Sequence, residues 1–97
     1  MTNQYEAMFI IKPDLSEEEK KNLFNQIGEA ITKAGGNVAS AAVWSDRKKL
    51  FFKLKKYTEG LYYLAAFSAP GAAIADIRRS YQLNENILRV MITALEK

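Results

Sequence analysis

The sequence contains no cysteine and no histidine among its 97 residues. Without cysteine the chain can form neither a disulfide framework nor a thiolate metal site. Without histidine it lacks the usual general base and the commonest metal ligand, and no imidazole is present to activate a serine. These absences predict a protein that is not an enzyme, with no metal, no cofactor and no small-molecule substrate.

Long hydrophobic runs are missing as well. The first apolar run ends at Lys12-Pro13, so it is too short for the apolar region of a signal peptide. The basic segment that would precede such a region is missing as well. No segment approaches the roughly 20 apolar residues that cross a membrane. Hydrophobic residues make up 48% of the chain and charged residues 26%, which is typical of soluble globular proteins. We therefore expect a cytoplasmic protein without membrane contact, in which residues 1–97 form one domain with its own core.

Positive charge is concentrated in one stretch. Arg47 to Lys56 reads RKKLFFKLKK and holds six basic residues and no acid, whereas the other 87 residues hold 8 basic and 11 acidic side chains. The net charge of +3 therefore arises from this stretch alone. Such a local field attracts a phosphate backbone. Lysines on an edge strand also discourage aggregation, and this alternative stays open for Lys53, Lys55 and Lys56.

Hydrophobic periodicity predicts four strands and two helices. Ser16 with Glu19 forms a capping box at the start of the first helix, and Gly35-Gly36 ends it. The remaining elements are expected at Tyr5–Ile11, Asn37–Trp44, Leu61–Ala69 and Ile87–Leu95 for the strands and at Ala72–Leu83 for the second helix. The basic stretch either continues the second strand or pairs back on it after Ser45-Asp46. Tyr57–Gly60 is expected to be a turn.

The order β-α-β-β-α-β predicts an α+β, ferredoxin-like fold. Two right-handed crossovers place both helices on one face of a four-stranded antiparallel sheet. The other face has no helix to cover it, and an uncovered apolar face usually marks an interaction site. The residues expected to bind a partner there are Met8, Ile10, Tyr62, Leu64 and Met91. Within the basic stretch, Leu50, Phe52 and Leu54 alternate with other residues and are expected in the core.

Aromatic side chains offer RNA a second kind of contact, because unpaired bases stack on rings beside basic groups. RNA-recognition modules share this element order, but the third strand matches their sequence pattern only in part. Tyr63 and Phe67 are expected in the core, whereas Trp44 and Tyr62 suit either packing or stacking. The acidic run Glu17-Glu18-Glu19 is explained by the helix start rather than by catalysis.

Four short motifs follow one another over nearly the whole chain. They are Tyr5-Glu6 leading to Pro13-Asp14-Leu15, Trp44 with Arg47 shortly after, Gly60 with the tyrosines that follow, and the run from Asn86 to Met91. Together they resemble the bacterial small-subunit ribosomal protein S6 family. The resemblance implies a ferredoxin-like fold, no catalysis and a place in the central domain (the platform) of the small subunit. It also implies binding to small-subunit ribosomal RNA and a heterodimer with ribosomal protein S18.

The residues expected to contact RNA come partly from this resemblance and partly from charge and exposed rings. The resemblance carries over RNA contacts to Tyr5, Arg47, Lys48 and Arg89. Charge and ring chemistry add Trp44, Lys49 and Lys53. The chain departs from the family in three places. Thr2-Asn3-Gln4 stands where an arginine is common, Ser45 where a glycine is common, and Leu50-Phe51-Phe52-Lys53-Leu54 where the family tends to read Leu-Ala-Tyr-Pro-Ile. A function of another class, a homo-oligomeric ferredoxin-like scaffold or regulatory domain not bound to RNA, is the alternative.

Overall fold

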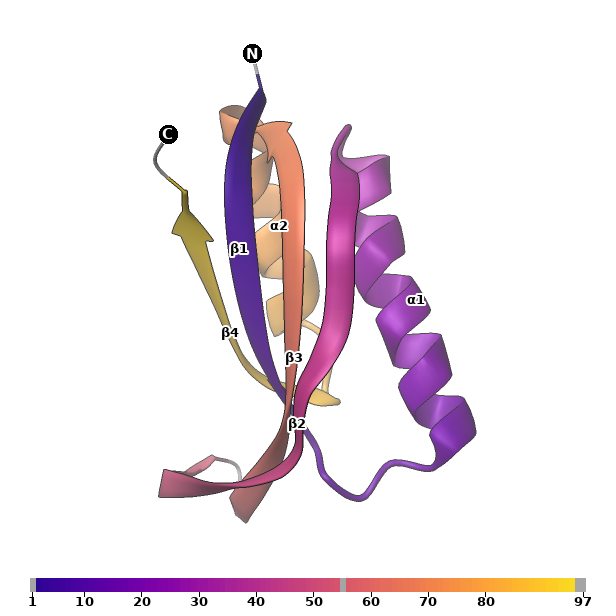
Figure 1. Cartoon of the computed structure of the whole chain (residues 1–97), viewed down its shortest axis with the longest axis vertical. Coiled ribbons are helices and arrows are strands. Elements are labelled where there is room, and N and C mark those ends of the chain that lie inside the picture. Colours follow the sequence, from indigo (N-terminus) through magenta and orange to yellow (C-terminus); the bar gives the residue numbers. More distant parts are fainter. Residues whose placement is uncertain (1, 55, 96–97) are drawn as a thin grey trace.

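The computed structural model describes residues 2–54 and 56–95, apart from the side chains of Phe51, Phe52 and Leu54. Its elements are β1 (Thr2–Ile11), α1 (Glu17–Lys33), β2 (Asn37–Leu54), β3 (Tyr57–Pro70), the 3-10 turn η1 (Gly71–Ala73), α2 (Ile74–Gln82) and β4 (Ile87–Ala94). The strands form an antiparallel sheet in the order β2-β3-β1-β4, with both helices on one face (Figure 1). The predicted ferredoxin-like arrangement is confirmed.

The first helix begins at the predicted capping box. The Ser16 hydroxyl accepts a hydrogen bond from the Glu19 backbone N–H at 3.1 Å, and the Glu19 carboxylate accepts one from the Ser16 N–H at 3.0 Å. The hydrogen bond from the Ser16 backbone N–H favours the charged carboxylate, so it lowers the pKa of Glu19. The helix ends at Lys33, and Gly35 follows the C-cap residue Ala34 with a φ of 90°, a left-handed conformation that suits glycine.

The core lies between the two helices and one face of the sheet. Alternate residues of β1 and β3 are buried there, since successive side chains of a strand point to opposite faces. Tyr81 of α2 crosses to α1, where its hydroxyl donates to the Ile27 carbonyl at 2.7 Å. Burial raises the pKa of Tyr81. Tyr63 and Phe67 are 7% and 2% exposed, which confirms the prediction that both pack in the core.

The β2–β3 hairpin is longer than predicted. β2 runs unbroken through Ser45-Asp46, so the basic stretch continues this strand and does not pair back on it. Tyr57–Gly60 forms the first part of β3 and pairs with β2, so the prediction of a turn there is wrong. The chain reverses instead near Lys56, which has a φ of 78°. Tyr57 and Thr58 are residue types that favour strands. The register shifts on either side of Ser45 keep Ser45 and Asp46 within β2, so these two residues do not form a turn.

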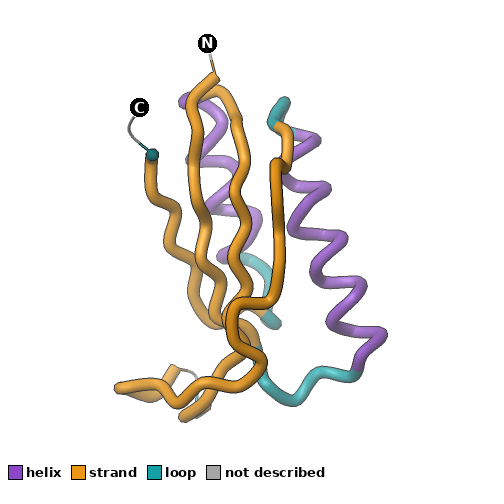
Figure 2. Tube along the Cα trace, viewed as in Figure 1, coloured by secondary structure: helices purple, strands orange, loops and turns teal. Residues whose placement is uncertain are grey.

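The far end of this hairpin bends away from the rest of the sheet (Figures 1 and 2). Leu50 is consequently only half-buried and is not a member of the core cluster, so the prediction of a core position is wrong for this residue. The same prediction for Phe52 and Leu54 concerns side chains that lie outside the described residues. The basic stretch is thus carried on the far end of the β2–β3 hairpin, which we call the hairpin extension.

Candidate RNA and partner-binding interface

The face of the sheet opposite the helices carries three rows of side chains across β3, β1 and β4. Cross-strand neighbours on one face of a sheet lie about 4.5–5.5 Å apart, so each row is a continuous strip of surface. The rows are Tyr62–Ile10–Arg89, Leu64–Met8–Met91 and Ala66–Glu6–Thr93. We call this surface the open face.

The middle row of the open face is entirely apolar. Met91 is 44% exposed, and Met8 and Leu64 are half-buried, so all three offer apolar surface. Ile10 of the neighbouring row is only 4% exposed, because Gly60 has no side chain and its backbone lies close to the isoleucine. Four of the residues expected to bind a partner are therefore accessible, including the half-buried Tyr62, and Ile10 supports them from below.

Trp44 stands where β2 meets the hairpin extension. It falls in a register shift between Val43 and Ser45 and is 56% exposed. Its ring lies 5.7 Å from the Tyr62 ring at an angle of 53°. The Lys48 ammonium lies 4.4 Å from the centre of the Trp44 ring and 5.4 Å from that of Tyr62. One cation and two accessible rings therefore form a compact group, as a site for an unpaired base beside a phosphate requires.

Arg47 is held by neighbouring groups. Its guanidinium donates to the Glu59 carboxylate at 2.9 Å and to the Pro13 carbonyl at 3.2 Å. The arginine thereby ties the hairpin to the loop between β1 and α1, and Glu59 offsets part of its charge. Lys49 and Lys53 are exposed further along β2. Lys48, Lys49 and Lys53 thus share one extended segment with Trp44.

Tyr5 and Arg89 lie apart from this segment. Tyr5 is 8% exposed and stacks on Phe67 with ring centres 5.6 Å apart, and its hydroxyl accepts a hydrogen bond from the Asn3 amide at 3.3 Å. Its place in the core accounts for an aromatic residue here. Arg89 is exposed on the open face opposite Ile10, two strands away from Tyr62. Both remain predicted RNA contacts, but they do not belong to the group formed by Lys48, Trp44 and Tyr62.

Two acids at this interface were not among the predicted site residues. Glu59 pairs with Arg47, and Glu6 lies on the open face two residues before Met8. The alternation of β1 was enough to place Glu6 there, whereas the position of Glu59 depended on a strand that was predicted as a turn. Within residues 2–54 and 56–95 there is no cluster of acids able to hold a metal ion. The described helices are also too short or too polar to cross a membrane.

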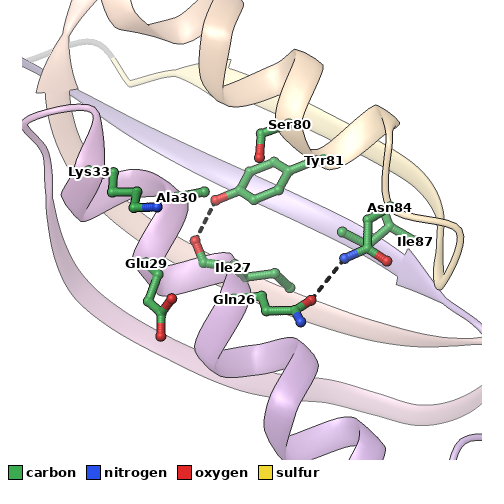
Figure 3. Close-up of a pocket in the computed structure, with 9 residues that line it drawn as sticks. All are labelled: Gln26, Ile27, Glu29, Ala30, Lys33, Ser80, Tyr81, Asn84 and Ile87. Atoms are coloured by element: carbon green, nitrogen blue, oxygen red, sulfur yellow. Dashed lines mark hydrogen bonds between the residues drawn. The ribbon is translucent and has the colours of Figure 1, made fainter.

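A hollow of about 260 Å³ lies between α1 and α2 (Figure 3). Tyr81 reaches the Ile27 carbonyl there, and the Asn84 amide donates to the Gln26 side chain at 3.1 Å. Both hydrogen bonds join α2 and the residues after it to α1. The residues that line the hollow accordingly hold the two helices together. The hollow lies in the helix layer, on the side of the sheet opposite the open face.

Comparison with known proteins identifies the family. The family model described as ribosomal protein S6 matches residues 4–94. The chain belongs to the ribosomal protein S6 family. Family members named small ribosomal subunit protein bS6 include that of Dictyoglomus turgidum, 42% identical over 97% of this chain and 96% of its own length. The protein of Thermosynechococcus vestitus is 38% identical over 100% of this chain and 84% of its own. The Campylobacter hominis relative is longer, and this chain spans 63% of it.

A solved structure agrees with this family membership. The 30S ribosomal protein S6 of Thermotoga maritima superposes with a TM-score of 0.88 at 26% identity, over 98% of this chain and 89% of that one. The predictions of the family, of a ribosomal protein of the small subunit and of a protein without enzymatic activity are confirmed by the family membership.

Proposed function

We propose that this S6-family protein binds small-subunit ribosomal RNA through its hairpin extension and ribosomal protein S18 through its open face. In this role it is a structural component of the platform of the small subunit in the cytoplasm. The observation that carries the proposal is the position of Lys48 over the rings of Trp44 and Tyr62, at the base of the basic stretch.

Charge and shape support the RNA part. The basic stretch on the extension holds six basic residues and no acid, and Glu59 on the opposite strand of the hairpin is engaged by Arg47. Because the extension projects from the sheet, a nucleic acid can approach Lys48, Lys49 and Lys53 without meeting the helices (Figure 1). Phosphate contacts supply affinity and depend on salt, whereas stacking on Trp44 depends much less on salt.

The apolar middle row supports the partner part. Leu64, Met8 and Met91 form a strip that neither α1 nor α2 covers, since both helices lie on the other face of the sheet (Figure 1). Protein interfaces commonly have an apolar centre with a polar rim. Glu6 and Arg89 lie in the rows on either side of this strip.

The RNA part is tested by replacing Lys48 and Lys49 with alanine. Binding of the chain together with equimolar S18 to a transcript of the central domain of small-subunit RNA is measured over a series of salt concentrations. Each phosphate contact contributes about 0.9 to the slope of log K against log salt, so the double variant should lower the slope by about one to two. The control replaces Lys21 and Lys33 of α1, which removes the same charge from the helix layer and should leave the slope nearly unchanged.

A second variant separates stacking from charge. Trp44→Leu keeps an apolar side chain but removes the ring, and the loss of one stacked base weakens binding by about 1–3 kcal/mol. The salt slope should stay the same, because no phosphate contact is lost. An unchanged slope in the double lysine variant would exclude Lys48 and Lys49 as phosphate ligands. A homodimer that neither S18 nor RNA alters would instead favour the scaffold function.

A further inference from the structure

Glu6 is the single acid among the described positions of the open face. Its cross-strand neighbours are Ala66 and Thr93, neither of which carries a charge. Glu6 is exposed, and its side chain makes no hydrogen bond or ion pair with any residue that the structure describes. The side chain therefore stands in water at the margin of the apolar row.

A shallow hollow of about 220 Å³ lies beside this carboxylate. Small side chains from β2 and β3, Ala42 and Ala66, leave it open, and Leu64 and Trp44 line it as well. A long basic side chain has the matching shape, because its methylene stem packs on apolar surface while its charged end reaches outward. The hollow is too small for a folded element and large enough for one such side chain.

Covering the open face has a cost at Glu6. Met8 is two residues away on the same face, about 7 Å along the strand, so a protein that covers the apolar row also removes water from Glu6. A carboxylate that loses water without gaining a partner is strongly unfavourable. A positive group of the covering protein compensates this loss best, because it makes a charge-assisted hydrogen bond to the carboxylate. A phosphate backbone is excluded from it by repulsion between like charges.

We propose that Glu6 and the adjacent hollow form a subsite for one arginine or lysine side chain of the protein that covers the open face. The stem of this side chain lies over Ala42 and Ala66 beside the Trp44 ring, and its cationic end pairs with the Glu6 carboxylate. The proposal rests on the proposed function, which names S18 as the covering protein. It adds that the ion pair between Glu6 and this cation contributes to the choice of partner and determines the orientation of the bound partner.

The test compares Glu6→Gln with Glu29→Gln. Both changes remove one negative charge and keep the shape of the side chain, but Glu29 lies on α1 at the hollow between the helices (Figure 3). Affinity for S18 is measured by titration calorimetry at two salt concentrations. Glu6→Gln should weaken binding about 10- to 100-fold and lessen its salt dependence, as for one member of a paired charge in an interface. Glu29→Gln should change the affinity less than about twofold, because no interface contact is lost.

A scan of S18 then identifies the cation. Each arginine and lysine of S18 is replaced in turn by glutamine and tested against the wild-type chain and against Glu6→Gln. One replacement should weaken binding to the wild-type chain and have no further effect on the variant, because the pair is already broken. If no position shows this coupling, the subsite does not hold a basic side chain of S18. If the wild-type chain binds S18 and Glu6→Gln binds equally well, the subsite is wrong while the proposed partnership with S18 stands. Failure of the wild-type chain to bind S18 would overturn both proposals.

Discussion

Replacing Gly60 with alanine tests whether close packing of Gly60 against Ile10 holds the hairpin extension against the sheet. A Cβ atom at Gly60 would lie 2.7 Å from Cγ2 of Ile10, 3.5 Å from the Ile11 carbonyl oxygen and 3.8 Å from Cδ2 of Leu50. Only the first distance is shorter than a normal contact. Ile10 is 4% exposed and β-branched, so it has little freedom to move aside. The glycine is thus required by close packing, since its φ is not among the positive values.

The expected cost follows from two opposing effects. An extra carbon in a packed region typically costs about 1–3 kcal/mol, whereas replacing glycine by alanine recovers about 0.4–1 kcal/mol by restricting the unfolded chain. The net loss in the free energy of unfolding at Gly60→Ala is then about 1–2 kcal/mol. For a domain of this size it lowers the melting temperature by about 5–15 °C.

Gly28→Ala is the matched control. Gly28 lies inside α1, and a Cβ atom there would meet nothing within 4 Å. The same chemical change should therefore stabilise the protein by about 0.8–1 kcal/mol, because alanine favours the helix. Urea denaturation followed by circular dichroism measures both variants. If Gly60→Ala proves as stable as the wild type while Gly28→Ala shows its gain, the contact between Gly60 and Ile10 does not hold the hairpin in place.

Two further predictions concern the helix layer. The pKa of Glu19 lies below its ordinary value of 4.5, so its capping contribution is fully present above that pH and is lost as the pH falls through the lowered pKa. In urea titrations over a pH series, Glu19→Gln should remove this part of the acid dependence and Glu18→Gln should not; equal curves for both would show that the bond to Ser16 does not set it. Tyr81→Phe removes the donor to the Ile27 carbonyl and should lower the free energy of unfolding by about 1 kcal/mol, measured by urea denaturation. No loss would mean that water replaces the hydroxyl at this carbonyl.

The two faces of the central strands could be predicted because their pairing is regular. β1 and β3 pair from Thr2 to Ile11 without a register shift, so alternation assigns each side chain correctly to the core or to the open face. The same alternation puts Glu6 on the face that carries Met8. Burial of Ile10 could not be predicted in this way, because it depends on how closely the Gly60 backbone approaches from a distant part of the chain.

The hairpin extension was harder to predict because β2 is irregular. Its pairing with β3 shifts register around Ser45 and again between Lys49 and Leu54, and every shift changes which side chains face the sheet. Counting alternate residues along this strand therefore gave Leu50 a core position that it does not have. The contact between Arg47 and Glu59 was missed for a related reason, since it depends on pairing at residues that resemble a turn in isolation.

Under the proposed function, the separation between Lys48 and Glu6 would allow one sheet to bind two partners of opposite charge. Lys48 contacts Tyr62, whereas Glu6 pairs across the sheet with Ala66, and the backbone positions of Tyr62 and Ala66 lie about 14 Å apart along β3. This distance exceeds the roughly 8 Å over which charges in water interact at physiological ionic strength. Under the proposed function, the positive potential that would attract phosphates to the extension is consequently screened at Glu6, and the carboxylate would not repel RNA bound at Lys48. The apolar row lies between these two positions and carries no charge, so a protein could cover it while the extension holds RNA, as the proposed function requires.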